Sequence, residues 1–209
     1  MISNNLRDLL DGYGTDKGRL YAPAYEVLLA PLQRTLETLL EVGIGTLIPD
    51  ANSSMVGYSA PHYRPGASLR AFRDYFQNAQ IYGLDVQHDT MLENEARIQT
   101  YLCDSTDAAQ VRTLATSGRL PTAFDVIIDD GSHRGADQLA TLANLHPLLR
   151  EGGLYFIEDI SEGCSHLFER PEEVATVCGT DAFLTVSYWN ADGPWKLMVI
   201  RKRCGVGQQ

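Results

Sequence analysis

Short apolar runs alternate with helix-like segments along most of the chain. Five apolar runs are expected to form strands, at 36–45, 80–86, 98–103, 124–130 and 154–160. The segments between them have the apolar spacing of helices, at 67–78, 90–97, 106–116 and 134–150. Two β-rich segments of the tail, 182–189 and 195–201, flank a turn and predict an antiparallel pair. This order predicts an α/β, doubly wound, mostly parallel seven-stranded sheet with an antiparallel C-terminal edge.

Length and composition favour a globular protein with one domain. The 209 residues suit a single domain, 1–209, with a helical lead-in at 1–35 and a loop insert at 46–66. The net charge of −10 makes nucleic acids and anionic membranes poor partners, because phosphate groups require clustered Lys and Arg. No apolar run approaches the roughly 18 residues of a membrane span, and no signal peptide is evident. The four cysteines form no Cys-x-x-Cys pair, which favours reduced thiols and a cytoplasmic location.

The first strand ends in a glycine turn that runs from Glu41 through Gly43 to Gly45. Glycines at a strand end let the backbone approach a ligand closely, although a plain tight turn has the same pattern. Asp85 ends the second strand, where a carboxylate can accept both hydroxyls of a ribose. Asp104 follows the third strand, where it can hold the amino group of adenine or cap the next helix. These positions predict a nucleoside-binding site.

The kind of nucleoside follows from the motifs that are absent. The sequence contains neither the GxxxxGK[ST] phosphate loop nor the GxGxxG dinucleotide motif. A nucleoside that carries a cationic sulfonium and no pyrophosphate suits an acidic glycine turn. We therefore expect S-adenosylmethionine as the cofactor.

Carboxylates gather at the ends of the fourth and fifth strands. The fourth strand ends in Asp129, Asp130 and, three residues on, His133, and the fifth ends in Glu158 and Asp159. If these strands are neighbours, the like charges repel unless a cation neutralises them. Oxygen ligands select a hard divalent ion such as Mg²⁺, although helix caps and a solvated turn would explain each cluster separately. A neutral imidazole at His133 is placed to accept a proton from a hydroxyl.

The insert at 46–66 leaves the glycine turn at the carboxyl edge of the sheet and is expected to run over the active site. Its residues Tyr58, His62 and Tyr63 suit either a lid or a loop packed against the sheet. His62 and His166 are further candidates for contact with an acceptor.

Several motifs together resemble a known family. They are YGTDK at 13–17, LEVGIG at 40–45, GASLR at 66–70, DYF at 74–76, GLD at 83–85, IDDGSH at 128–133 and GLYFIED at 153–159. They are similar to the metal-dependent class I sugar O-methyltransferases of antibiotic biosynthesis, of the macrocin and mycinamicin type, which are related to cephalosporin hydroxylase. The resemblance covers 13–160 strongly and implies a Rossmann-like fold. Unlike the macrolide enzymes, this sequence is expected to have no extra N-terminal domain, and its insert has its own sequence; both differences leave the acceptor sugar and the oligomeric state open.

The resemblance also implies roles for individual residues. It implies that Mg²⁺ is held by Asp130, Glu158 and Asp159, and that His133 is the general base. It implies that S-adenosylmethionine is bound by Glu41, Gly43, Ser68, Asp85 and Asp104, beneath a lead-in segment that contains Tyr13, Thr15 and Lys17. Gly45 and Asp129 complete the predicted cofactor site.

We therefore predict a Mg²⁺-dependent O-methyltransferase that moves a methyl group from S-adenosylmethionine to a hydroxyl of a sugar or glycosylated natural product. The ion would bind two adjacent oxygens of a small-molecule diol, His133 would accept a proton, and the oxygen would attack the methyl group in line. A catechol or small-phenol O-methyltransferase would use the same chelation. A partner subunit that binds the cofactor without transferring the methyl group is the non-enzymatic alternative. A homo-oligomer is possible.

Overall fold

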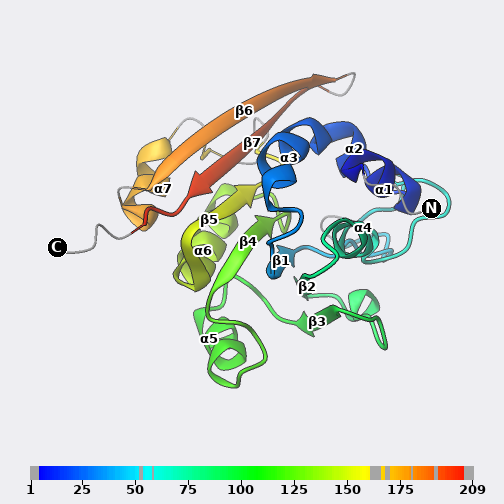
Figure 1. The fold of residues 1–209 in the computed structure, drawn as a ribbon, viewed down its shortest axis with the longest axis horizontal. Helices are drawn as coiled ribbons and strands as arrows, with labels where there is room; N and C mark the ends of the chain where they lie inside the picture. The colour runs from blue at the N-terminus through cyan, green and yellow to red at the C-terminus, as the bar shows by residue number, and fades with distance from the viewer. Residues whose placement is uncertain are drawn as a thin grey trace. The chain divides into compact units, whose positions relative to one another are not determined.

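The computed structural model describes residues 5–51, 54–57, 59–160, 166–167, 170–179, 181–190 and 193–204. The chain divides into two compact units, Met1–Asp104 and Ser105–Gln209, whose elements are labelled in Figure 1. The expectation of a single domain over 1–209 stays a prediction.

The first unit contains three parallel strands. Its elements are α1 (Leu6–Tyr13), α2 (Lys17–Leu20), α3 (Ala22–Leu29), η1 (Ala30–Leu32), β1 (Thr38–Val42), α4 (Ala67–Tyr75), β2 (Gln80–Asp85), η2 (His88–Thr90) and β3 (Ile98–Leu102). β2 lies between β1 and β3, and Asp85 at its end is opposite Leu102 of β3. Parallel pairing places the carboxyl ends of all three strands at one edge.

The core of the first unit forms where α4 packs against β2 and β3. Leu69 and Phe72 lie one turn apart on α4, so both point to the same side, and both are fully buried. The ring of Tyr25 from α3 meets the Phe72 ring edge-on, with the centroids 5.8 Å apart. Each such buried side chain contributes about 1.5–3 kcal/mol, which fixes the helices against the strands.

The second unit contains the other four described strands. Its elements are α5 (Ala108–Thr116), β4 (Phe124–Asp129), α6 (Gly135–Leu145), η3 (His146–Leu148), β5 (Leu149–Ile157), α7 (Pro171–Cys178), β6 (Ala182–Asn190) and β7 (Gly193–Arg201). β4 pairs with β5 in parallel, β7 pairs antiparallel with β5, and β6 pairs antiparallel with β7. Every residue of β4 is buried, as its unbroken apolar run predicts. α6 packs against β4, and α5 and α7 contact α6.

The predicted fold class is confirmed: the chain is α/β, its first five strands pair in parallel within their units, and its last two form an antiparallel edge. The helix predicted near 90–97 is wrong. A loop occupies most of that stretch, where Asn94 and Arg97 have positive φ angles of 59° and 60°. Helix α7 was not predicted. No helix among the described residues is long and apolar enough to cross a membrane.

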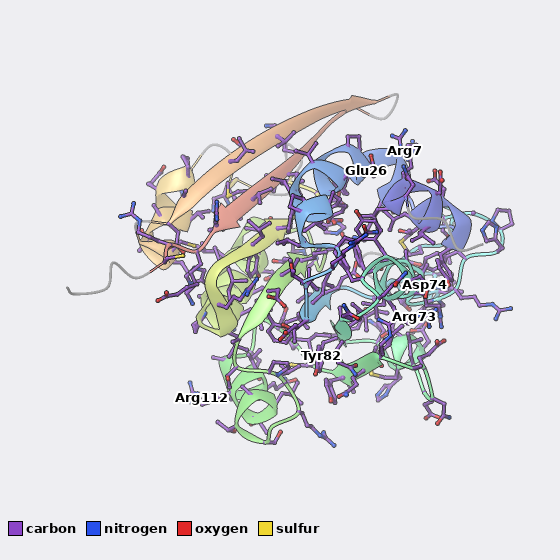
Figure 2. All side chains as sticks on the ribbon, viewed as in Figure 1. Arg7, Glu26, Arg73, Asp74, Tyr82 and Arg112 are labelled. Atoms are coloured by element: carbon purple, nitrogen blue, oxygen red, sulfur yellow. The ribbon has the colours of Figure 1, made fainter. Side chains whose placement is uncertain are left out.

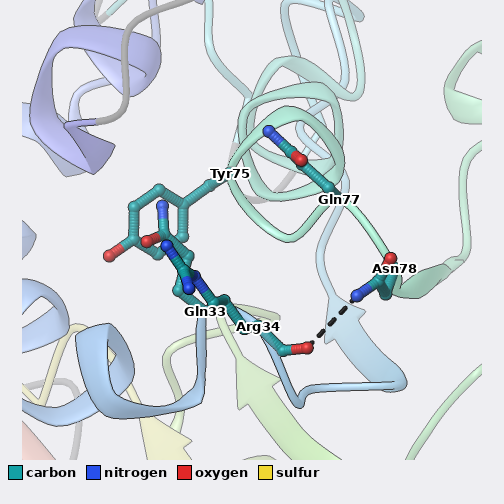
Figure 3. A pocket seen from close by; sticks show the side chains of 5 residues that line it. All are labelled: Gln33, Arg34, Tyr75, Gln77 and Asn78. Carbon is teal, nitrogen blue, oxygen red and sulfur yellow. Dashed lines mark hydrogen bonds between the residues drawn. The ribbon is translucent and has the colours of Figure 1, made fainter.

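A cavity of about 220 Å³ lies at the amino ends of β1 and β2 (Figure 3). Its lining consists of Gln33, Arg34, Tyr75, Gln77 and Asn78. The Asn78 side chain donates a hydrogen bond to the carbonyl of Arg34, with 3.2 Å between the atoms. This cavity is at the edge of the strands opposite to the glycine turn.

Candidate active site

The glycine turn follows β1 directly. Gly43 and Gly45 have φ angles of 84° and 86°, in the left-handed region that glycine adopts without strain. The backbone N–H of Gly43 donates to the carbonyl of Leu84 at 2.9 Å, which extends the pairing of β1 with β2 by one residue. The turn therefore begins where the β1–β2 pairing ends.

Asp85 lies beside this turn and connects it to the end of β2. One carboxylate oxygen accepts a hydrogen bond from the backbone N–H of Ile44 at 2.8 Å, and the other accepts one from Gln87 at 2.9 Å. Burial raises the pKa of Asp85, and these backbone hydrogen bonds oppose the rise. Because each carboxylate oxygen has a second lone pair, Asp85 can still accept hydrogen bonds from the hydroxyls of a ribose.

Large apolar side chains are exposed at the same edge. Val86, directly after β2, is 57% exposed, and Leu102, at the end of β3, is 45% exposed. Exposed apolar side chains next to a carboxylate suit the flat face of a nucleobase. Asp104 is half-buried two residues beyond Leu102. The idea that Asp104 caps the next helix is wrong, because Asp107 is the N-cap of α5 and accepts hydrogen bonds from Ala109 and Gln110.

Three predicted cofactor residues form a buried cluster. The Lys17 ammonium lies 3.2 Å from one carboxylate oxygen of Glu41, and both side chains are almost fully buried. The Ser68 hydroxyl donates to the other Glu41 oxygen at 2.7 Å. Thr15 is also buried, and its hydroxyl lies 3.4 Å from the backbone N of Lys17. The structure thus brings the lead-in segment to the end of β1, and the roles of these residues toward the cofactor stay a prediction.

Tyr13 has different partners. Its hydroxyl donates to a carboxylate oxygen of Asp74 on α4 at 2.6 Å, and Arg73 donates to the other oxygen at 2.8 Å. Figure 2 labels Arg73 and Asp74 side by side on α4. Burial and the Asp74 carboxylate raise the pKa of Tyr13. Tyr13 therefore anchors the lead-in segment to α4, and its role toward the cofactor stays a prediction.

Asp130, His133 and Asp159 come together at the ends of β4 and β5. Each offers one ligand atom, and these atoms lie within 4.8 Å of one another. Nε2 of His133 is 3.0 Å from Asp130 and 3.5 Å from Asp159. Two carboxylates and an imidazole at this spacing, all partly exposed, fit a small divalent cation.

The backbone is strained at two of these three residues. His133 and Asp159 have φ angles of 60° and 52°, which cost non-glycine residues of order 1–3 kcal/mol each. Burial alone lowers the pKa of His133, but the hydrogen bond to Asp130 and the charges of Asp130 and Asp159 outweigh it and raise the pKa to about 9. The two carboxylates are thus the cause of the raised pKa, and a cation at the same place would neutralise the same negative charge.

The other two predicted carboxylates are buried beside this group. Glu158 is 1% exposed, and its backbone N–H donates to the carbonyl of Asp129 at 2.9 Å. Glu158 is not a member of the three-residue group, so its metal role stays a prediction. Burial raises the pKa of Asp129 to about 7, and one of its carboxylate oxygens accepts no hydrogen bond from the described residues. Asp129 thus lies beneath the site, and its cofactor role is also untested.

Helix capping does not account for the acidic cluster. The N-cap residue of α6 is Arg134, and no side chain caps the helix. The Ser132 hydroxyl instead donates to Asp137 at 2.7 Å. The interpretation of Asp130 or Ser132 as the cap of this helix is therefore wrong.

Residues of the insert lie against the glycine turn and the lead-in segment. Tyr63 is 8% exposed, and its hydroxyl is 2.9 Å from the carbonyl oxygen of Gly45. His62 lies against Gly14, where a Cβ would be 3.1 Å from its Nε2. Tyr58 lies outside the described residues. His166 is 2.7 Å from Glu173 of α7.

One important residue was not predicted from the sequence. The Asp89 carboxylate accepts hydrogen bonds from the Thr46 hydroxyl at 2.7 Å and from the Leu47 backbone N–H at 2.9 Å. It thereby fixes the first residues of the insert. No sequence signal marks this contact, because more than 40 residues separate the partners.

No protein-family model matches this chain. The chain is 35% identical over 150 residues to the 8-demethyl-8-alpha-L-rhamnosyl tetracenomycin-C 2'-O-methyltransferase of Streptomyces olivaceus. The matched stretch covers 71% of this chain and 35% of that relative. It is also 35% identical over 159 residues to the mycinamicin VI 2''-O-methyltransferase of Micromonospora griseorubida, and this match covers 75% of the chain and 36% of the relative.

Solved structures give the same result. The methyltransferase MycE from the mycinamycin biosynthetic pathway, in complex with Mg and SAH, has a TM-score of 0.73 and 26% sequence identity. The match covers 98% of this chain and 56% of MycE. A further MycE structure contains Mg, SAH and mycinamycin VI, with the same TM-score.

The chain spans about a third of the curated relatives that it matches, 35% and 36% of their lengths. Within that span, the resemblance seen in the motifs is confirmed. The chain is a homologue of the sugar O-methyltransferases of macrolide and tetracenomycin pathways, and it has their Rossmann-like methyltransferase fold.

Proposed function

We propose that this chain is a Mg²⁺-dependent O-methyltransferase that moves a methyl group from S-adenosylmethionine to a sugar hydroxyl of a glycosylated natural product. The observation that carries the proposal is the cluster of Asp130, His133 and Asp159 at the ends of β4 and β5. The two curated relatives reported above are named as O-methyltransferases, of a rhamnosylated tetracenomycin and of mycinamicin VI. A small glycosylated acceptor also agrees with the net charge of −10, which disfavours nucleic acid.

The edge formed by β1, β2 and β3 is the proposed place of S-adenosylmethionine. The glycine turn offers close approach of the backbone, and Asp85 offers acceptors for the ribose hydroxyls. Val86 and Leu102 offer apolar surface to the adenine ring. Glu41 is a further acidic group at this edge, held by Lys17 and Ser68.

Asp130 and Asp159 are proposed to hold the metal, with Glu158 as a third ligand. When bound, Mg²⁺ supplies positive charge that orients acceptor oxygens and lowers the pKa of the hydroxyl to be methylated. Nε2 of His133 is the proposed proton acceptor. It must be neutral for this task, so its hydrogen bond to Asp130 has to be released in the working enzyme.

We also propose that the enzyme works in the cytoplasm, as part of a secondary-metabolite pathway. Among the residues that the structure describes, Cys178 and Cys204 form no disulfide, which supports a reducing compartment.

A transfer assay tests this function. The protein should be incubated with S-adenosylmethionine, Mg²⁺ and a panel that contains a rhamnosylated tetracenomycin, a macrolide glycoside, a methyl glycoside and a catechol. We expect mass spectrometry to find a methyl group on the sugar of a glycosylated acceptor. Methylation of the catechol alone would identify a phenol O-methyltransferase, and no transfer to any acceptor, with the cofactor bound, would favour a non-catalytic partner subunit.

His133→Ala is the informative variant in this assay. Loss of a general base lowers kcat by about 10²–10⁴. Calorimetric affinities for S-adenosylhomocysteine should stay close to those of the wild type, because the variant leaves the glycine turn and Asp85, the proposed cofactor residues, unchanged. A wild-type kcat in this variant would contradict the assignment of His133 as the base.

A further inference from the structure

The Tyr63 hydroxyl lies on the backbone of the glycine turn. It is 2.9 Å from the carbonyl oxygen of Gly45 and 3.2 Å from that of Ile44, both within hydrogen-bond distance. The side chain is 8% exposed, so water competes little for the hydroxyl proton. This tyrosine belongs to the insert, whereas both carbonyls belong to the turn.

Gly45 is shaped to receive this hydroxyl. Its φ angle of 86° is in the left-handed region, and a Cβ at this position would collide with the Tyr63 hydroxyl. The same Cβ would lie 3.0 Å from Cγ of Met55. Gly45 is therefore required both for its backbone conformation and for the close approach of the insert.

The insert is tied to the turn and to the lead-in segment by backbone hydrogen bonds. Met55 donates to Thr46 at 2.9 Å, and Gly66 donates to Ile44 at 3.1 Å. Ala60 donates to Gly14 of the lead-in segment at 3.2 Å. Hydrogen bonds thus join the glycine turn, the insert and the lead-in segment. The Tyr63 side chain adds a contact from the insert to the carbonyls of the turn.

We propose that Tyr63 is a positioning residue that holds the glycine turn in its cofactor-binding conformation and links cofactor occupancy to order in the insert. The inference rests on the proposed cofactor site at this turn. If the hydroxyl stabilises the turn conformation that binds cofactor, then bound cofactor stabilises the hydroxyl contact by the same factor, because such coupling is reciprocal. The described residues of the insert, such as Met55 and Ala60, then become more ordered when the cofactor is bound.

Tyr63→Phe tests the proposal, because it removes the hydroxyl and keeps the buried ring. We expect the dissociation constant for S-adenosylhomocysteine, measured by calorimetry, to rise about tenfold, the factor that corresponds to about 1.4 kcal/mol. Tyr75→Phe is the matched control. Tyr75 is a buried tyrosine of the same unit at the opposite edge of the strands, so its variant should bind like the wild type. Gly45→Ala should weaken binding as well, because it displaces the same hydroxyl.

Hydrogen exchange supplies a readout that a merely structural tyrosine would not change. S-adenosylhomocysteine should slow exchange of the Met55 and Ala60 amides in the wild type and in Tyr75→Phe. It should leave them unchanged in Tyr63→Phe. The melting temperature of this variant should fall by only about 2–4 °C, since one lost hydrogen bond is a small part of the total stability.

The outcomes separate the two proposals. Failure of the wild type to bind S-adenosylhomocysteine would overturn the proposed function and this inference with it. Equal affinity and equal exchange behaviour of wild type and Tyr63→Phe would overturn only the inference about Tyr63. A lower melting temperature with unchanged affinity would also overturn it, because Tyr63 would then serve packing alone.

Discussion

At the scale of single residues, the buried Lys17–Glu41 ion pair is expected to contribute strongly to the stability of the fold, because it joins the lead-in segment to β1. Both side chains are almost fully buried, 3.2 Å apart. Removing one partner of a buried pair leaves an uncompensated charge, which costs about 3–5 kcal/mol. Lys17→Met should therefore lower the free energy of unfolding by about that amount, as measured by urea denaturation.

Two further variants test whether charge is the cause. Glu41→Gln in the Lys17→Met background should recover part of the lost stability, because it removes the unpaired charge. Arg19→Met, an exposed position on the same helix, should change stability by less than about 0.5 kcal/mol. If Lys17→Met unfolds like the wild type, the pair does not have the structural role that its burial indicates.

The hydrogen bond from Tyr13 to Asp74, which anchors the lead-in segment to α4, makes the free energy of unfolding depend on pH in the acid range. Burial alone raises the pKa of Asp74, but the hydrogen bonds from Arg73 and Tyr13 outweigh it and hold the pKa below its usual range. A lowered pKa in the folded state contributes stability above the unfolded value of about 3.9, and this contribution is lost as the pH falls through the folded value. Asp74→Asn should be about 1 kcal/mol less stable than the wild type at pH 7.

The difference between wild type and Asp74→Asn should begin to shrink as the pH falls below about 4, because the unfolded Asp74 then takes up a proton. It should be lost once the pH is also below the lower folded pKa of Asp74, where both side chains are uncharged. Thermal unfolding of the two proteins at pH 7, 5, 4 and 3 measures this. A stability difference that stays constant down to pH 3 would mean that the negative charge of Asp74 does not stabilise the contact between Tyr13 and α4.

Residue types at strand ends could be predicted from the sequence, but their partners could not. Asp130, His133 and Asp159 were predicted together because each follows the end of an apolar strand, and the structure brings them together. The contact of Lys17 with Glu41, and that of Tyr13 with Asp74, depend on how the lead-in folds back. No local pattern determines such contacts between distant segments.

At the scale of elements, the start of the insert depends on η2. Asp89 of that short helix accepts hydrogen bonds from Thr46 and Leu47. Asp89→Ala should speed amide exchange of Leu47 several-fold, with little change in the melting temperature, since the contact is largely exposed. Glu93→Ala, an exposed acidic position in the following loop, is the control. Unchanged exchange at Leu47 in Asp89→Ala would show that the insert holds its start without this anchor.

Elements with strong apolar patterns were predicted well, and weakly patterned ones were not. The buried strand β4 lies within its predicted range, because six consecutive buried residues leave little alternative. The stretch at 90–97 has helix-forming residues, but Leu92 donates to the Thr100 hydroxyl at 2.8 Å, and the chain follows β3 instead of closing a helix. Tertiary contacts of this kind override local propensity.

At the scale of the whole molecule, the likeness to MycE extends over 98% of the chain, while the chain spans only 56% of MycE. The shared part contains both proposed sites: the cofactor edge of the first unit and the carboxylate cluster of the second. In the proposed function methyl transfer requires both sites, whereas most of the residues predicted to bind the cofactor belong to the first unit. This separation provides a direct test of metal dependence.

Turnover as a function of Mg²⁺ is the measurement that tests the central claim most directly. After treatment with EDTA, the protein should transfer no methyl group from S-adenosylmethionine to its glycosylated acceptor, yet it should bind S-adenosylhomocysteine as before. Added Mg²⁺ should restore turnover in the wild type but not in Asp130→Asn, which lacks one of the clustered carboxylates. Full turnover by the metal-free protein would contradict the account, because Asp130 and Asp159 would then not hold a catalytic metal ion.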